Sequence, residues 1–402
     1  MQKKRSIKIV AIMLILVLIC ISITYFKNDS KEVLATTREF NSENLQDNEH
    51  MHVEIDNSGD KVPVPNGYVG SKAAGENEID TGYVIYEGEE EVNDENVEDA
   101  QKTRNQYVWI PVPDASTMYG TDTNGKKWGK LYSFTTEIGE NIDPITGAKP
   151  LNWSESDGIM KIINKVQRRE PDIIKDYDVD SRIKELDLDS NTTHLFLLQL
   201  EREFNNMIKS VEKYGGFYIG RYETGNLNKE EVVIRKQNTY LDNQQTWYMA
   251  YKKCRRLNNS NGNIGTGLLW GCQFYRTLVW LIESGNKTKE EICKDSTGWG
   301  NYKDATFEYI DNNGNTIIKN IGEDTIIPTG STEYTKSNNI YDLAGNVNEW
   351  NMIALDSFAR LYMGGAYYNQ DNFSVDSNDA TTPYNINAHI RLSSNAIYKM
   401  MI

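Results

Sequence analysis

The alternation of apolar and polar residues predicts several β-strands in this 402-residue chain. TGYVIYEG, NQYVWIPVP and GFYIGRYETG are rich in aromatic and β-branched residues and are bounded by turn residues, which is typical of strands. The first two are separated by the acidic stretch EGEEEVNDENVEDA, so they predict two strands at a sheet edge joined by a solvated loop. FEYIDNNGNTIIKN predicts a β-hairpin with Asn313 and Gly314 at its tip.

Three other stretches carry the three- and four-residue period of an amphipathic helix. The clearest is SNTTHLFLLQLEREFNNMIKSVEKYGG, where the glycine pair predicts the end of the helix. TWYMAYKKCRRLN and CQFYRTLVWLIESG predict two shorter helices that end at Asn or Gly. After Thr325 the helical period is scarce, and we expect irregular loops with a few short strands. The predicted apolar positions of the first helix are Leu195, Leu198, Phe204, Met207, Ile208 and Val211.

An uncharged apolar run from Ile9 to Phe26 follows the basic start MQKKR. As a helix it would be about 27 Å long, enough to cross a bilayer. The basic residues before it keep that end in the cytoplasm. We expect an uncleaved membrane anchor over residues 1–28 rather than a cleaved signal peptide, because no small-x-small triplet closes the run. Under either alternative, the remainder of the chain is extracytoplasmic.

Residues 29–60 are polar and acidic without an apolar period, which predicts a disordered tether. The folded domain is then expected over residues 61–402. The net charge of −15 is concentrated between Asp29 and Gln106, where the sequence has 20 acidic and 6 basic residues. Such a charge argues against nucleic acid as the main partner. Aromatic residues make up 10% of the chain, which favours a globular and partly β body.

The cysteines and histidines give little indication of a redox or transition-metal centre. Cys254, Cys272 and Cys293 lie outside the anchor and lack the CxxC spacing of zinc sites, so we expect small buried side chains with at most one disulfide. No nucleophile elbow, phosphate-binding loop or HExxH helix occurs in the sequence, and no catalytic residue is proposed. The histidines lack a metal-binding helical spacing, so surface or capping roles are favoured over iron ligation. They are His50, His52, His194 and His389.

The stretch YDLAGNVNEW combines hard oxygen donors in a short segment rich in turn residues. The side chains of Asp342 and Glu349 and the backbone carbonyls of Gly345 and Val347 are the ligand types that calcium prefers. In the alternative, the stretch is a plain tight turn in which Asp342 and Asn346 bond backbone amides. Both alternatives are open, and a bound ion would act on folding stability rather than on catalysis.

Six stretches follow one another along the chain: GGFYIGRYETG, TWYMAYKKCRRLN, LLWGCQFYRTLVWLIESG, NNIYDLAGNVNEW, LYMGGAYYN and HIRLSS. In this order they resemble the formylglycine-generating enzyme, or sulfatase-modifying factor, family. The resemblance covers about residues 61–402. It implies an α+β fold, the family's variant of the C-type lectin fold, with a twisted, mainly antiparallel sheet, flanking helices and much irregular structure. It also implies that Asp342, Gly345, Val347 and Glu349 bind a structural calcium ion.

The chain departs from that family at the residues of its aerobic catalysis. The two active-site cysteines that the resemblance leads us to expect are absent from MGGAYYNQDNFSVDSNDATTPYNINAHIRLSS, and Met363 replaces the family's arginine before a glycine pair. Without thiolates there is neither a copper site nor disulfide exchange with a substrate. We therefore expect no formylglycine-generating activity and no copper or iron. The helical histidine ligands of the iron-dependent sulfoxide synthases of similar fold are also missing from the sequence.

Two functions of different classes follow. The first is a membrane-anchored binding module that recognises an extracellular protein or glycan through its C-terminal loops. These loops are dense in Tyr, Asn, Asp and Ser, as adaptable binding loops are. The alternative is a metal-dependent oxidase or another modifying enzyme that acts on an exported protein or wall polymer. Two further alternatives are open: the C-terminal loops are ordinary surface loops with the tyrosines packed sideways, or the chain is a structural surface protein whose acidic tether sets spacing. The candidate ligand-binding residues are Tyr367, Tyr368, Asn369, Asp371, Asn372, Phe373 and Arg391.

Overall fold

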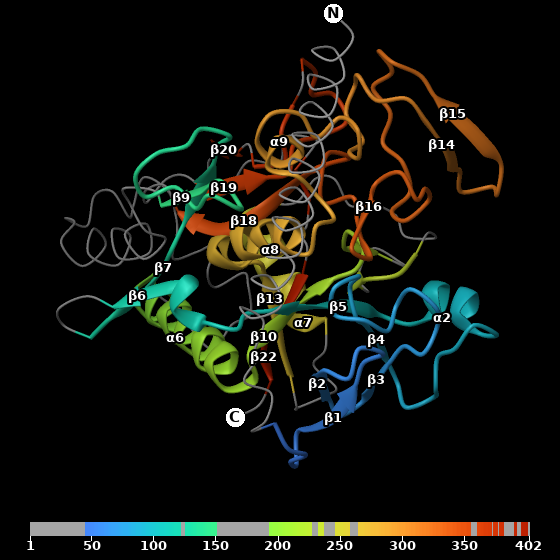
Figure 1. Ribbon diagram of the computed structural model, residues 1–402. Coiled ribbons are helices and arrows are strands. Elements are labelled where there is room, and N and C mark those ends of the chain that lie inside the picture. The colour runs from blue at the N-terminus through green and yellow to red at the C-terminus, as the bar shows by residue number, and fades with distance from the viewer. Residues whose placement is uncertain are drawn as a thin grey trace, which may run out of the picture. The chain divides into compact units, whose positions relative to one another are not determined.

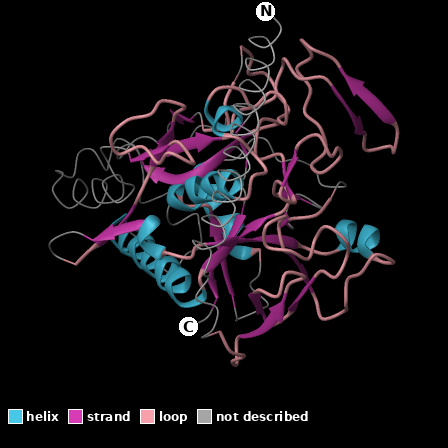
Figure 2. Cartoon of the chain, viewed as in Figure 1, coloured by secondary structure: helices cyan, strands magenta, loops and turns pink. Residues whose placement is uncertain are grey.

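The computed structural model describes residues 45–121, 125–150, 193–226, 232–236, 246–257, 264–354, 360–371, 373–376, 378–381, 390–391 and 395–400. These residues form an α+β arrangement of small, mostly antiparallel sheets and a few helices, with long loops between them (Figure 2). The predicted anchor, Ile9–Phe26, lies outside the described ranges. Of the helices within those ranges, none combines the length and the apolar character needed to cross a membrane.

A six-stranded sheet lies at the centre of the described structure (Figure 1). Each neighbouring pair in it is antiparallel, and its strands come from distant parts of the sequence. β-branched and aromatic residues fill β5 and β10, which are buried along their whole length. In spatial order the strands are β13 (Ile264–Leu268), β22 (Asn395–Met400), β10 (Gly216–Gly220), β5 (Gln106–Pro111), β4 (Val84–Glu87) and β3 (Tyr68–Gly70).

Helices cover this sheet and connect it to a second one. The helix α8 (Gly271–Glu283) contacts both β5 and β18 and is buried on nearly all sides, which its apolar composition explains. The helix α6 (Thr193–Tyr214) contacts β10 and β22. Its neighbour α7 (Trp247–Arg256) contacts β13 and begins at Thr246, whose hydroxyl accepts a hydrogen bond from the amide of Met249 at 3.1 Å. The short helices are α2 (Val97–Thr103), α9 (Lys289–Cys293) and the 3₁₀ turn η2 (Ala115–Thr117).

The second sheet has four strands, and its inner strand β18 begins with the last three residues of the YDLAGNVNEW stretch. The strand β18 pairs with β19 in an antiparallel and with β21 in a parallel arrangement. In spatial order the strands are β20 (Asn378–Thr381), β19 (Arg360–Met363), β18 (Asn348–Ala354) and β21 (Ile390–Arg391). The remaining strands form two-stranded sheets: β1 (Met51–Ile55) with β2 (Lys61–Pro65), β6 (Tyr119–Thr121) with β7 (Lys127–Gly129), β8 (Tyr132–Phe134) with β9 (Ala148–Pro150), β11 (Gly225–Asn226) with β12 (Val232–Val233), β14 (Phe307–Ile310) with β15 (Thr316–Lys319), and β16 (Lys336–Ser337) with β17 (Ile340–Tyr341).

Most of the strong sequence patterns predict the observed elements. The strands β4, β5 and β10, the helices α6, α7 and α8, and the hairpin β14–β15, drawn in orange in Figure 1, are confirmed. The position of β4 and β5 differs from the prediction, because β3 forms the sheet edge and α2 lies in the acidic segment between them. In α6 the predicted positions Phe204, Met207, Ile208 and Val211 are buried, which confirms that part of the pattern. The first turns differ, because Leu195 and Leu198 are exposed while Phe196 and Leu200 are buried.

Ordered structure begins earlier than the sequence predicts. The strand β1 lies within residues 29–60, the range expected to be a disordered tether. Its Met51 is buried. The carboxylate of Glu54 accepts hydrogen bonds from the amide of Gly70 and from the hydroxyl of Tyr83, both at 2.9 Å. A carboxylate in this polar stretch thus serves as an internal hydrogen-bond acceptor, which charge density alone does not reveal.

A buried ion pair joins the end of β10 to the loop between β3 and β4. The guanidinium of Arg221, directly after β10, lies 2.6 Å from the carboxylate of Glu76. The hydroxyls of Ser71 and Tyr86 each donate to the same carboxylate at 2.8 Å. The side chain of Gln101 adds a third donor at 2.9 Å. Because these partners replace the water that both charges lose, the pair can exist in the interior.

Candidate functional site

The YDLAGNVNEW stretch connects β17 to β18 through a backbone that enters the left-handed region three times. The φ angles are 60° at Asp342, 78° at Gly345 and 57° at Asn346. Asp and Asn tolerate this conformation better than other side-chain-bearing residues. A Cβ atom at Gly345 would lie 2.5 Å from the carbonyl oxygen of Asn301, with which this residue forms an isolated bridge. Glycine is therefore required at 345 by both the backbone angle and the close approach.

The side chain of Asn346 ties this loop to three other segments. Its Oδ1 accepts hydrogen bonds from the Asn301 amide group and from the Ile327 backbone amide, both at 3.0 Å. Its Nδ2 donates to a Glu223 carboxylate oxygen at 2.6 Å and to the Ile327 carbonyl at 3.2 Å. Both polar ends of the buried amide are thus satisfied, as a buried polar side chain requires.

Asp342 is buried in the same part of the loop. Its Oδ2 accepts hydrogen bonds from the Thr329 hydroxyl at 2.8 Å and from the Gly330 amide at 3.1 Å. Together with the bond from Ile327 to Asn346, this gives the loop the backbone contacts expected of a tight turn. A carboxylate has further lone pairs, so these bonds and a calcium ligand role are compatible.

Glu349 lies in β18, where its register partners are Met363 of β19 and Arg391 of β21. The side chain of Glu349 is buried. Cys254 of α7 is also buried, which raises the pKa of its thiol, and the negative charge of Glu349 raises that pKa further. Within the described residues, no three His, Cys, Asp or Glu side chains form a group that could hold a metal. A set built partly from carbonyls is not such a group, so the calcium site of Asp342, Gly345, Val347 and Glu349 stays a prediction.

Four of the predicted ligand-binding residues lie together in one loop after β19. Tyr367 and Tyr368 form an edge-to-face pair with ring centroids 5.3 Å apart. Tyr368 is 37% exposed, and its hydroxyl accepts a hydrogen bond from the Asn348 side chain at 2.8 Å. Asn369 is half-buried, and Asp371 is exposed. We call this segment the Tyr367–Asp371 loop, and its side chains form a small polar and aromatic surface.

Backbone hydrogen bonds hold the Tyr367–Asp371 loop in place. The amide of Tyr367 donates to the carbonyl of Asn346 at 3.0 Å, and the carbonyl of Asn369 accepts from Lys303 at 2.8 Å. The amide of Asp371 donates to a carboxylate oxygen of Asp304 at 2.6 Å. The loop is therefore fixed to the same Asn346 that organises YDLAGNVNEW.

The other predicted ligand-binding residues are placed differently. Phe373 is half-buried and packs on Tyr302, with ring centroids 5.5 Å apart. Arg391 is placed by its backbone in β21, next to Glu349 of β18. Asn372 lies outside the described residues. The structure thus brings Phe373 against the core rather than to the surface formed by Tyr367 and Tyr368.

Sequence reasoning missed the residues that hold the loop from outside. Glu223, Asn301 and Thr329 are buried polar partners of Asn346 and Asp342. Asn301 precedes Asn346 by 45 positions and Glu223 precedes it by 123. No periodicity or motif in the sequence joins positions so far apart.

Comparisons with known proteins leave the family open. No family model matches the chain, and no curated protein matches it. Among solved structures, the crystal structure of CarF matches with a TM-score of 0.30 and 13% sequence identity, over 45% of this chain and 86% of that one. A similarity this low carries no argument about fold or function.

Proposed function

We propose that this chain is a membrane-anchored, extracytoplasmic binding protein with a sulfatase-modifying-factor-like domain. It recognises an extracellular protein or glycan through the Tyr367–Asp371 loop and lacks formylglycine-generating activity. The anchor is the apolar run Ile9–Phe26. The missing cysteine pair after Met363 supports the second statement, because the family's catalysis depends on thiolates.

The observation that carries the proposal is an exposed tyrosine on a backbone that is already fixed. Tyr368 presents a large amphipathic ring with few rotatable bonds, which gives contact area at a low entropic cost. Its hydroxyl is held by Asn348, and its neighbour Tyr367 is held by Asn346. A preorganised surface of this kind loses little conformational freedom on binding.

Calcium has a supporting role in this proposal. An ion bound by Asp342, Gly345, Val347 and Glu349 would stabilise the turn on which the Tyr367–Asp371 loop rests. We expect the full-length chain, purified without chelator, to contain calcium and to melt at a lower temperature after EDTA treatment. Elemental analysis and thermal unfolding measure both quantities. A calcium-free protein whose melting temperature is unchanged by EDTA would leave the plain turn as the explanation.

The binding proposal is tested with the full-length chain on arrays of cell-wall glycans and of peptides from surface proteins. For any ligand that the native chain binds, we expect Tyr368→Ala to weaken binding about tenfold, since an exposed aromatic anchor contributes roughly 1–2 kcal/mol. The matched control is Tyr309→Ala, which removes a partly exposed tyrosine from the β14 strand. Equal binding by the native chain and Tyr368→Ala would contradict the proposal.

A further inference from the structure

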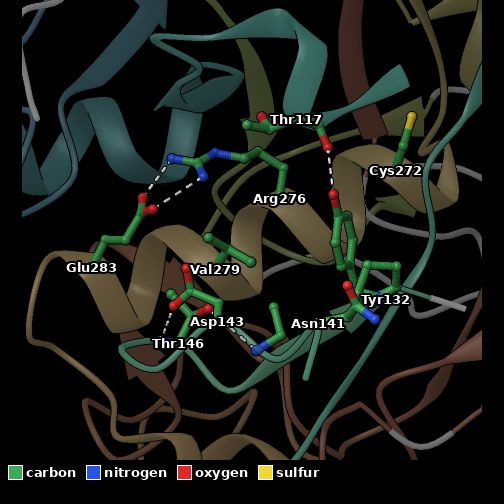
Figure 3. A pocket seen from close by; sticks show the side chains of 11 residues that line it. Thr117, Tyr132, Asn141, Asp143, Thr146, Cys272, Arg276, Val279 and Glu283 are labelled. Carbon is green, nitrogen blue, oxygen red and sulfur yellow. Dashed lines mark hydrogen bonds and ion pairs between the residues drawn. The ribbon is translucent and has the colours of Figure 1, made fainter. Parts of the chain in front are cut away.

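A cavity of about 240 Å³ lies beside α8 (Figure 3), and its lining contains no residue of the Tyr367–Asp371 loop. One wall is the outer side of α8, where Cys272, Arg276, Val279 and Glu283 follow one another at helical spacing. The opposite wall comes from β8 and β9 and from the turn between them. None of these residues belongs to the site described above, so the cavity calls for a separate explanation.

The cavity has one apolar side. Figure 3 shows the ring of Tyr132 and the side chain of Cys272 toward the same end of the cavity, although they come from opposite walls, with Val279 nearer the centre. The hydroxyl of Tyr132 donates to the carbonyl of Thr117 at 3.0 Å, which fixes the orientation of the ring. Apolar surface predominates in the lining. A ligand must therefore bring an apolar body to be held here.

The cavity also has one charged side, where carboxylates outnumber cations. The guanidinium of Arg276 forms a two-point ion pair with Glu283, with distances of 2.5 and 3.3 Å. Its Nε donates to the carbonyl of Pro111 at 3.4 Å. The charge of this arginine is thus already balanced within the protein. Glu283 is 33% exposed, so one end of the pair is accessible to solvent.

Asp143 adds a second carboxylate to the lining. Its Oδ1 accepts hydrogen bonds from the amides of Ile145 at 2.9 Å and Thr146 at 2.7 Å, which fix the side chain in the turn. Its Oδ2 takes part in neither bond, and the residue is exposed. Lys289 donates to the carbonyl of Pro144 at 2.9 Å but does not line the cavity. The charged lining residues therefore comprise two carboxylates and one guanidinium.

The size of the cavity limits the ligand. Its volume corresponds to about eight water molecules, at roughly 30 Å³ each in the liquid. Sites for drug-sized ligands begin at about 300 Å³. A single ring or a short alkyl chain with one polar group fits these limits.

We propose that this cavity binds a small organic ammonium ion. The apolar body of the ligand packs against Tyr132 and Val279, and its charged end lies beside the carboxylates of Asp143 and Glu283. The excess of negative charge in the lining favours a cation over an anion. An anion would have to displace Glu283 from Arg276 and would then lie near Asp143. This inference is independent of the binding role proposed for the Tyr367–Asp371 loop.

The test compares three probes of similar shape and different charge on the full-length chain. They are phenethylamine, 2-phenylethanol and 3-phenylpropanoate, and ligand-observed NMR with titration gives their dissociation constants. We expect the amine to bind at least about tenfold more tightly than either of the others. No saturable binding of the amine, or tighter binding of the carboxylate, would overturn the proposal.

Variants locate the binding to the cavity. Val279→Trp fills it and should abolish binding of the amine. Asp143→Asn removes one charge but keeps an acceptor for the two turn amides, so it should fold normally and weaken the amine about fivefold or more while leaving 2-phenylethanol unchanged. Ile318→Ala, on the exposed hairpin β14–β15, is the control and should bind as the native chain does. Amine binding that survives in both cavity variants would place the site elsewhere and overturn the proposal.

Discussion

Two arginine–glutamate pairs with the same chemistry occupy different environments in this protein. The side chains of Arg221 and Glu76 are 2% and 6% exposed, whereas those of Arg276 and Glu283 are 9% and 33% exposed. Three neutral side chains donate to Glu76, so its oxygens are used within the protein. The second pair borders a cavity. The comparison teaches that a salt bridge joins segments when it is enclosed by donors and can contribute to a ligand site when it lies at a cavity wall.

The largest effect is expected from breaking the enclosed pair. Glu76→Gln leaves the Arg221 charge buried without its counter-charge, and we expect the free energy of unfolding to fall by about 3–5 kcal/mol. The matched control is Glu283→Gln, for which the expected loss is below about 1 kcal/mol because that pair is partly solvated. Denaturant unfolding of the two variants and the native chain measures the difference. Similar losses in both variants would show that burial does not distinguish the pairs.

A smaller effect is expected from acid. Burial alone would raise the pKa of Glu76, but the Arg221 guanidinium and the hydrogen bonds from Tyr86 and Ser71 hold it below its ordinary value. Stability from this group is therefore fully present above the unfolded pKa of about 4.3 and is lost as the pH falls through the lower folded pKa. We expect the native chain to lose more stability than Glu76→Gln between pH 5 and strongly acidic conditions. Unfolding curves across this range test it, and parallel losses in the two proteins would refute it.

The difference between the pairs also shows what a sequence can reveal. The strands β4, β5 and β10 and the helices α7 and α8 follow from local periodicity, since each pattern lies within about a dozen residues. The partners Arg221 and Glu76 are brought together only by the order of strands in the central sheet. Arg276 and Glu283 lie on one helix, yet the cavity beside them depends on β8 and β9.

The candidate site also combines features that local sequence predicts with features that depend on contacts between distant residues. YDLAGNVNEW and the tyrosine-rich loop were identifiable from residue types, because left-handed turns favour Asp, Asn and Gly and binding surfaces favour Tyr. The inward position of Phe373 was not, because its partner Tyr302 lies far away in the sequence. Glu223, whose carboxylate accepts a hydrogen bond from the Asn346 side chain, could likewise not be identified, because it lies in a strand-to-turn stretch without a distinctive pattern.

The position of β22 has a consequence for how this protein is made. Residues 395–400 lie between β13 and β10, and hydrogen bonds join them to both. During synthesis these two strands are made long before β22, and each then has an unpaired edge where the sheet will close. Such edges invite pairing with other chains, and long-range closure is slow. The time between the synthesis of β10 and that of β22 is therefore the period in which a chaperone would matter most to this protein.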